Sequence, residues 1–146
     1  MGVKATFLTM FLAFTMLGCS STGSSRHDAN ISKYEAVYFS DDIGVFDQKY
    51  LPAVARTLER NGLKVVTKKS GPNVLMCKLA IDQSNLFGYR VHVSLWDGPD
   101  IIFVAEAKNS GWGTLLASDA AVQNLLSSAL DELDKELQRN RMQINR

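Results

Sequence analysis

Apolar and polar residues alternate with a period of two through the middle of the chain, and this pattern is typical of strands in a half-buried sheet. It is clearest in residues 89–96, where every odd-numbered position from Tyr89 to Leu95 is apolar. Turn-forming dipeptides, Gly71-Pro72 and Gly98-Pro99, separate the alternating segments. Together they predict five strands, at residues 34–40, 63–67, 74–82, 89–96 and 101–108.

Two other segments repeat their apolar residues at helical spacing. The first helix is predicted over residues 48–61, with Pro52 in or near its first turn, where a missing amide costs least, and with Gly62 as the left-handed residue that ends it. The second is predicted over residues 118–138 and carries a broad apolar stripe after the N-cap residue Ser118. Four acids of this helix lie off the stripe: Asp131, Glu132, Asp134 and Glu136.

The order of these elements is strand, helix, strand, three more strands and a final helix. The first strand–helix–strand unit predicts a crossover between parallel neighbours, and the next three strands predict a meander. The fold class is therefore α+β: a two-layer sandwich in β-α-β-β-β-β-α order, with a mixed, mostly antiparallel sheet and both helices on one face. The domain is predicted to span residues 33–140, and residues 141–146 are expected to be a polar tail that frays.

Cys77 falls on the inward face of the predicted strand 74–82, together with Leu75, Leu79 and Ile81. A reactive thiol needs an exposed, electropositive setting. We therefore interpret Cys77 as an inert buried thiol.

An apolar run precedes all of these elements. Positions 7–17 carry only apolar residues and two threonines, after the basic residue Lys4 and before the small residue Gly18. The run is shorter than the about 20 apolar residues that a membrane-spanning helix needs, and its order of charge, apolar centre and small residue is that of a secretory signal. Residues 1–18 are therefore predicted to be a signal peptide.

The residues at the end of this run, Met16-Leu17-Gly18-Cys19, resemble the lipobox of bacterial lipoproteins. The resemblance implies cleavage before Cys19, a diacylglycerol on its sulfur and an acyl chain such as palmitate on its new amine. In enteric-type members of that family, a serine after the cysteine, here Ser20, implies sorting to the outer membrane, facing the periplasm. The alternative is a plain secretory signal or an uncleaved anchor, in which Cys19 is incidental.

Residues 20–32 are polar and rich in serine, and they are predicted to form a flexible tether after the lipidated Cys19. Such a tether has a root-mean-square reach of roughly 20 Å. If Cys19 carries lipid, Cys77 is left without a partner. No internal disulfide is then expected, so the stability of the domain must come from packing.

The charge balance excludes a nucleic-acid partner. The chain has 16 Lys and Arg against 15 Asp and Glu, and the signal contains one of the bases and no acid, so the mature chain has equal numbers of both. It carries no basic block that would attract nucleic acid or anionic lipid. Attachment to the membrane is therefore expected to come from the lipid on Cys19, since two or more acyl chains suffice for stable anchoring.

No motif of known chemistry is found along the chain. It lacks a glycine-rich phosphate loop after a strand, a G-x-S-x-G elbow and a cluster of metal ligands at suitable spacing. A catalytic set of a serine and His92 with Asp82 or Asp97 can be imagined, but His92 lies on the polar face of a strand. The protein is therefore not expected to be an enzyme, and no cofactor, metal or catalytic residue is predicted.

Three large apolar residues stand in predicted loops, where burial is not assured: Leu86, Phe87 and Trp112. Exposed aromatic residues on loops are the usual anchors of protein interfaces, so these three are the candidate partner contacts. Glycines on both sides let the backbone present the Trp112 ring without steric conflict. In the alternative, Trp112 packs under the second helix. Trp96, on the polar face of its strand, is expected to pack on a neighbouring strand residue.

The order of elements over residues 34–137 resembles that of the small α/β domains of periplasm-facing lipoproteins. The likeness rests on residues 58–66, LERNGLKVV, and on the end of the meander at residues 93–97, VSLWD. The group includes the curli-export lipoprotein, the lipoprotein activators of penicillin-binding proteins and the amino-terminal domain of the Tol-system propeller protein.

In these relatives the domain docks partner proteins and has no catalytic centre. The resemblance therefore implies a protein-binding accessory or assembly module of the cell envelope. Two alternatives stay open. One is an envelope binder that holds a glycan or an apolar small ligand between sheet and helices, and the other is a hydrolase.

Overall fold

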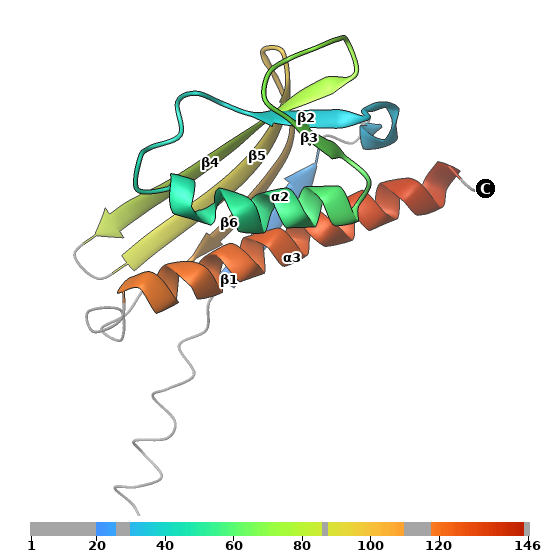
Figure 1. The fold of residues 1–146 in the computed structure, drawn as a ribbon. Helices are drawn as coiled ribbons and strands as arrows, with labels where there is room; N and C mark the ends of the chain where they lie inside the picture. Colours follow the sequence, from blue (N-terminus) through green and yellow to red (C-terminus); the bar gives the residue numbers. More distant parts are fainter. Residues whose placement is uncertain (1–19, 26–29, 86–87, 110–117, 145–146) are drawn as a thin grey trace, which may run out of the picture.

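Two helices cover one face of a six-stranded sheet (Figure 1). The computed structural model describes residues 20–25, 30–85, 88–109 and 118–144. The α+β sandwich with a mixed sheet, expected from the sequence, is confirmed. The strands are β1 (Ser20–Ser25), β2 (Ala36–Phe39), β3 (Lys64–Val66), β4 (Val74–Asn85), β5 (Gly88–Asp97) and β6 (Asp100–Lys108). The helices are α2 (Leu51–Arg60) and α3 (Ser118–Ile144), and two short 3-10 helices are η2 (Ile31–Lys33) and η3 (Gln48–Tyr50).

The strands lie in the order β1-β6-β5-β4-β2-β3 across the sheet. Strand β2 runs parallel to both β3 and β4, which confirms the predicted crossover between parallel neighbours around α2. Strands β4, β5 and β6 form the predicted antiparallel meander. Helix α3 packs across β5, β6 and β1, while α2 lies beside it and contacts β3.

Strand β1 was not expected, because residues 20–32 were predicted to be a flexible tether. Instead, Ser20–Ser25 pairs antiparallel with β6, from Ser20 opposite Lys108 to Ser25 opposite Phe103. The outer edge of β6 presents backbone amides and carbonyls that need partners, and any extended segment can supply them through its own backbone. Further along the expected tether, Ile31 begins η2 and is buried in the core. The tether prediction is therefore wrong for these parts of the segment.

The core lies between the sheet and the helices, as the alternation predicts. The inward residues of the central strands, among them Leu75, Val93 and Phe103, meet the stripe residues Leu125 and Leu133 of α3. Cys77 is completely buried on the same face, as predicted, and desolvation raises the pKa of its thiol to about 12. At neutral pH the thiol is therefore protonated and inert, as its place in the strand indicated.

Helix α2 ends at the predicted glycine. Gly62 has a φ of 78°, its amide donates to the Glu59 carbonyl at 2.8 Å, and the next amide, of Leu63, donates to the Leu58 carbonyl at 3.1 Å. A side chain at position 62 would meet only the guanidinium of Arg141, the mobile end of a long side chain. The left-handed backbone at Gly62 is therefore what requires a glycine at the end of this helix.

Helix α3 continues to Ile144, beyond the predicted end at residue 138 and into the expected tail. Its last turns are held by Asn140, which is buried and accepts a hydrogen bond from the Ile31 amide at 3.3 Å. Asn140 also donates to Glu136 Oε1 at 2.9 Å, and Arg139 Nη1 lies 2.7 Å from Glu136 Oε2. Glu136 lies off the apolar stripe but is buried, because η2 and the neighbouring side chains cover this part of α3.

Candidate functional site

The site residues predicted from the sequence lie outside the described part of the chain. They are Cys19, Leu86, Phe87 and Trp112. Whether these side chains contact lipid or a partner stays a prediction.

The described residues next to them lie at one end of the sheet. Ser20 is opposite Lys108, and Asn85 is opposite Gly88. The Asn109 amide donates to the carbonyl of Tyr89, near the start of β5. Because the strands are antiparallel here, β1 and β5 begin where β4 and β6 end (Figure 1). We call this end, with the cross-strand series Ser20–Lys108–Arg90–Asp82, the anchor end of the sheet.

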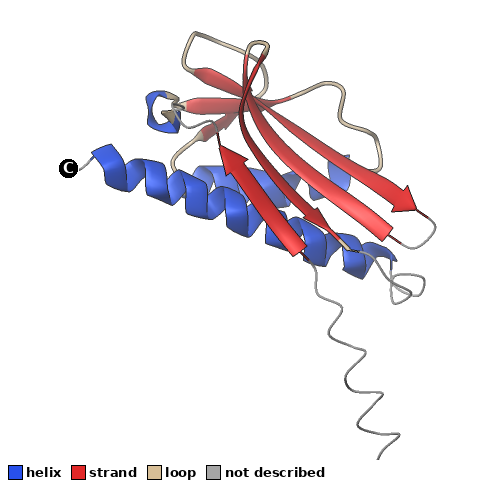
Figure 2. Ribbon diagram, turned by 180° about the vertical axis from the view of Figure 1, so that it is seen from behind, coloured by secondary structure: helices blue, strands red, loops and turns tan. Residues whose placement is uncertain are grey.

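The face of the sheet away from α2 and α3, called the outer face, carries the even-numbered residues of β4 and β5. Figure 2 looks onto this face, and among the described residues no helix packs on it. Its side chains are mostly half-buried, as in Lys78, His92 and Trp96, whereas the odd-numbered Cys77 and Val93 are fully buried. The outer face is therefore the largest regular surface that the described elements leave without a covering layer.

An apolar row crosses the outer face away from the anchor end. The strand register places its members directly opposite one another on five adjacent strands, β3, β2, β4, β5 and β6. Each is half-buried except Ile101, which is 44% exposed. The row, kept under this name below, consists of Val66, Tyr38, Met76, Trp96 and Ile101.

Trp96 is held in place within this row. Its Nε1 donates to Ser94 Oγ at 2.8 Å, and the Lys78 ammonium lies 4.9 Å from the ring centroid. Lys78 belongs to the neighbouring strand β4, so the predicted packing of this ring on a neighbouring strand residue is confirmed, and Met76 lies opposite Trp96 on the same strand. These contacts hold the ring in one orientation. Binding a partner would therefore cost little additional side-chain entropy at Trp96.

Charged residues occupy the outer face between the apolar row and the anchor end. His92 Nδ1 lies 3.6 Å from Glu106 Oε2, and Arg90 Nε lies 3.5 Å from Glu106 Oε1. Asp97, one of the acids considered for a catalytic set, instead accepts from the Tyr34 hydroxyl at 2.5 Å. His92 contacts the Glu106 carboxylate, and this pair does not assemble a nucleophile, a base and an orienting acid.

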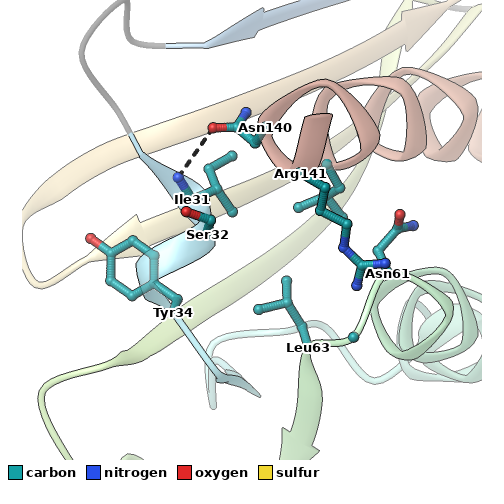
Figure 3. A pocket seen from close by; sticks show the side chains of 9 residues that line it. Ile31, Ser32, Tyr34, Asn61, Leu63, Asn140 and Arg141 are labelled. Carbon is teal, nitrogen blue, oxygen red and sulfur yellow. Dashed lines mark hydrogen bonds between the residues drawn. The ribbon is translucent and has the colours of Figure 1, made fainter. Parts of the chain in front are cut away.

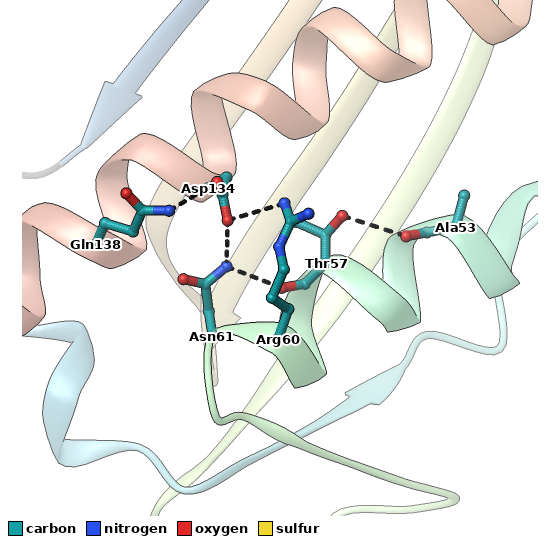
Figure 4. Close-up of polar contacts among 6 residues, drawn as sticks. All are labelled: Ala53, Thr57, Arg60, Asn61, Asp134 and Gln138. Atoms are coloured by element: carbon teal, nitrogen blue, oxygen red, sulfur yellow. Dashed lines mark hydrogen bonds and ion pairs between the residues drawn. The ribbon is translucent and has the colours of Figure 1, made fainter.

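A polar cluster around Asp134 joins the end of α2 to α3 (Figure 4). Asn61 Nδ2 donates to Asp134 Oδ1 at 2.6 Å and to the Thr57 carbonyl at 2.9 Å. Arg60 Nη2 lies 3.1 Å from the same carboxylate oxygen, and Gln138 Nε2 donates to the other oxygen at 2.8 Å. The carboxylate thus has partners on both oxygens, and the cluster holds α2 in position on α3.

Hollows between described residues open on the helical layer. One, of about 190 Å³, lies between η2 and the ends of α2 and α3, where Asn140 is bonded to the Ile31 amide and Arg141 reaches toward the end of α2 (Figure 3). It is smaller than most small-molecule sites, which enclose about 300–1,000 Å³. Since its two buried polar side chains, Asn61 and Asn140, already have partners inside the protein, this hollow is interpreted as a packing junction.

The second hollow, of about 340 Å³, is a groove between α2 and the first half of α3. Lys49 at its end bonds Asp119 Oδ1 at 2.8 Å, and this contact holds the pKa of Asp119 below its usual value. Its wall mixes Tyr50, Leu126 and Leu130 with exposed polar side chains such as Arg56 and Gln123.

The described residues contain neither a metal cluster nor a membrane-spanning helix. No group of three or more His, Cys, Asp or Glu side chains in this part of the chain is arranged to hold a metal ion. None of the helices described there is long and apolar enough to cross a bilayer.

The apolar row was missed at the level of the sequence. Its signal was available within single strands, since Tyr38, Met76 and Trp96 are large apolar residues on the faces opposite the core residues. What the sequence lacks is the register that brings residues from five strands into line.

Comparisons with known proteins found solved structures whose similarity to this chain is low. No protein-family model matches the chain, and no curated protein matches it. A variant of PelC from Paraburkholderia phytofirmans, a dodecamer, has a TM-score of 0.49 at 15% identity, over 80% of this chain and 98% of that one.

A DUF4136 family protein from Bacteroides thetaiotaomicron has a TM-score of 0.49 at 9% identity, over 87% of this chain and 96% of that one. Another PelC dodecamer from Paraburkholderia phytofirmans has a TM-score of 0.42 at 15% identity, over 76% and 97% of the two chains. Similarity at this level does not establish a shared function.

The Asp134 cluster makes a direct prediction about stability. Replacing Asp134 with alanine removes the acceptor shared by Asn61, Arg60 and Gln138. Because the carboxylate is partly exposed, we expect a loss of about 1–2 kcal/mol in the free energy of unfolding. The matched control is Asp131→Ala, at an exposed acid one turn earlier in α3, where the change should stay within about 0.5 kcal/mol. Urea unfolding of both variants gives the values, and equal losses would contradict the role of Asp134.

Proposed function

We propose that this protein is a bacterial outer-membrane lipoprotein, anchored through Cys19 and facing the periplasm, that binds another envelope protein as an accessory or assembly module. The docking surface is the outer face of the sheet, centred on the apolar row. The protein has no catalytic role in this proposal, and it needs no metal or cofactor.

The anchoring part rests on the sequence. The apolar run, the small residue and Cys19 follow one another in the order of a lipoprotein signal. The neutral mature chain offers no electrostatic alternative for membrane attachment. Two or three acyl chains on Cys19 would hold the protein stably, since each buried methylene contributes about 0.8 kcal/mol.

The apolar row is the single observation that carries the binding part. Isolated apolar residues are common on protein surfaces, but a continuous series is unusual and marks an interaction site. Five strands at a spacing of about 4.8 Å make the row about 19 Å wide, which suits the centre of a protein interface. Tyrosine, tryptophan and methionine, which are enriched in such centres, occupy its three middle strands, at Tyr38, Met76 and Trp96.

The alternatives have less support. A ligand held between sheet and helices needs space there, but in the described part of the chain that layer is filled by buried side chains, and the two hollows lie outside it. A hydrolase needs an assembled catalytic set, whereas His92 faces Glu106 and Asp97 faces Tyr34. Protein binding uses the surface that these contacts leave open.

The anchoring part is tested by Cys19→Ser in cells. Without the sulfur no diacylglycerol can be attached, so we expect the variant to remain unprocessed or to appear in the soluble envelope fraction. Membrane fractionation and intact-mass measurement of the product read out both states. A variant that is cut at residue 18 and still sediments with the membrane would contradict lipid anchoring.

The binding part is tested by position-dependent photo-crosslinking in cells. A photoreactive amino acid at Ile101, in the apolar row, should give a discrete adduct with a partner protein, and one at Gln123, exposed on α3, should not. Adding Trp96→Ala to the Ile101 probe should abolish the adduct. We expect this change to lower stability by only about 1–2 kcal/mol, since it removes a cation–π contact and a cross-strand pair but no fully buried group.

A matched control for Trp96→Ala is Met142→Ala, which truncates an exposed apolar residue on α3, away from the outer face. The adduct should persist in this variant. The proposal would be overturned if the Ile101 and Gln123 probes gave the same adducts, or if the Ile101 adduct survived in a folded Trp96→Ala variant.

A further inference from the structure

Val45 and Phe46 are the most exposed large apolar side chains in the described part of the chain, at 79% and 88% of their full surface. They are adjacent and stand at the tip of a tight turn between β2 and η3. The turn is closed by the amides of Asp47 and Gln48, which both donate to the Gly44 carbonyl, at 2.9 and 3.2 Å. An apolar pair at the tip of a well-formed turn is a feature that neither folding nor partner binding by the apolar row explains.

The turn is held firmly on both sides. Ile43, before it, is buried in the core, and Tyr50, after it, is buried as well. Figure 1 shows the segment between β2 and η3 running beside the part of β4 that extends beyond β2, where Asp47 interacts with the Ile81 backbone. With these contacts in place, Val45 and Phe46 cannot fold back into the core without loss of buried packing. The tip is therefore a fixed apolar projection.

The turn lies at the anchor end of the sheet. Asp47 contacts Ile81 and lies near Asp82, the β4 member of the cross-strand series that ends at Ser20. Ser20 is already paired with β6, and the next residue toward the amino terminus is Cys19. From β4 to β1 the sheet spans three strand spacings, about 14 Å. A lipid on Cys19 would thus hold the anchor end at the bilayer surface, within reach of Val45 and Phe46.

Charge at the anchor end is mixed. The basic residues there are Arg90, Lys108 and Lys49, and the acidic ones are Asp47, Asp82 and Asp119. Two more acids, Asp41 and Asp42, precede the turn in the sequence. Such a surface has no excess of positive charge to attract anionic headgroups. A contact with lipid must then come from apolar insertion, which is how short apolar loops and amphipathic segments bind at the interface.

We infer that Val45 and Phe46 insert into the same membrane leaflet that holds the lipid of Cys19, and that this second contact fixes the orientation of the domain on the membrane. The inference rests on the lipid anchoring proposed above. The occupant of this surface is the lipid bilayer, and the contact is independent of anionic lipid. It leaves the outer face of the sheet standing away from the bilayer.

A lipid-quenching experiment tests the contact on the full-length mature lipoprotein. With Cys19 lipidated and Cys77 buried, the thiol introduced by Phe46→Cys is the one that an environment-sensitive, thiol-reactive dye can label. The labelled protein is reconstituted into phosphatidylethanolamine–phosphatidylglycerol vesicles, with and without brominated lipids. Insertion to the depth of interfacial segments, about 5–10 Å, should raise the dye emission by about twofold or more, and brominated lipid should quench it.

The matched control is Met142→Cys, at an exposed apolar residue near the other end of α3. Asp119, which contacts the anchor end through Lys49, lies 23 residues earlier in the same helix, or about 34 Å along its axis. A dye there should be neither enhanced nor quenched. Val45→Cys is a second insertion probe, and protection of Cys77 from labelling confirms that each variant is folded.

The outcomes separate the two claims. Quenching at positions 45 and 46 but not at 142, unchanged in purely zwitterionic vesicles, is the expected result. Lipid on Cys19 by mass spectrometry, together with unquenched dyes at 45 and 46, would overturn the membrane contact and leave anchoring intact. The absence of lipid on Cys19 would overturn both.

Discussion

The pairing of β1 with β6 determines where the folded domain stands relative to Cys19. Backbone hydrogen bonds along Ser20–Ser25 close the edge of β6, and α3 packs over the joined strands. Because Ser20 is already part of the sheet, no free linker separates the proposed lipid from the fold. A domain on a 13-residue tether could rotate freely above a membrane. A domain whose first strand begins next to the lipidated residue instead keeps that end of its sheet at the membrane surface.

The rest of the proposed function follows from the two ends and two faces of this sheet. Strand β5 runs from the anchor end toward the apolar row, and the six residue steps from Arg90 to Trp96 correspond to about 20 Å. The helices cover one face and are locked together by Asp134, so the outer face stays open on a rigid frame. A partner that meets Trp96 and Met76 would therefore do so at a set height above the bilayer.

Much of the fold could be predicted because its causes are local. Alternation placed Cys77 inward, and the glycine at position 62 marked the end of α2, since both depend on neighbours in sequence. The sequence-based predictions failed where segments that are distant in the sequence come into contact. Strand β1 has no apolar periodicity and pairs with β6 through its backbone, and the last turns of α3 depend on a contact between Asn140 and Ile31 across the chain. The apolar row likewise requires the register of five strands, and the exposure of Phe46 is visible only once the core is complete.

Amide hydrogen–deuterium exchange of β1 tests this account most directly. If Ser20–Ser25 is a strand of the sheet in the mature lipoprotein, the β1 amides that face β6 should exchange much more slowly than those of an unstructured peptide, with protection approaching that of β6 itself. Exchange of all six residues at the unstructured rate, while β6 remained protected, would contradict the account. The domain would then hang on a free tether, with no fixed orientation toward the membrane.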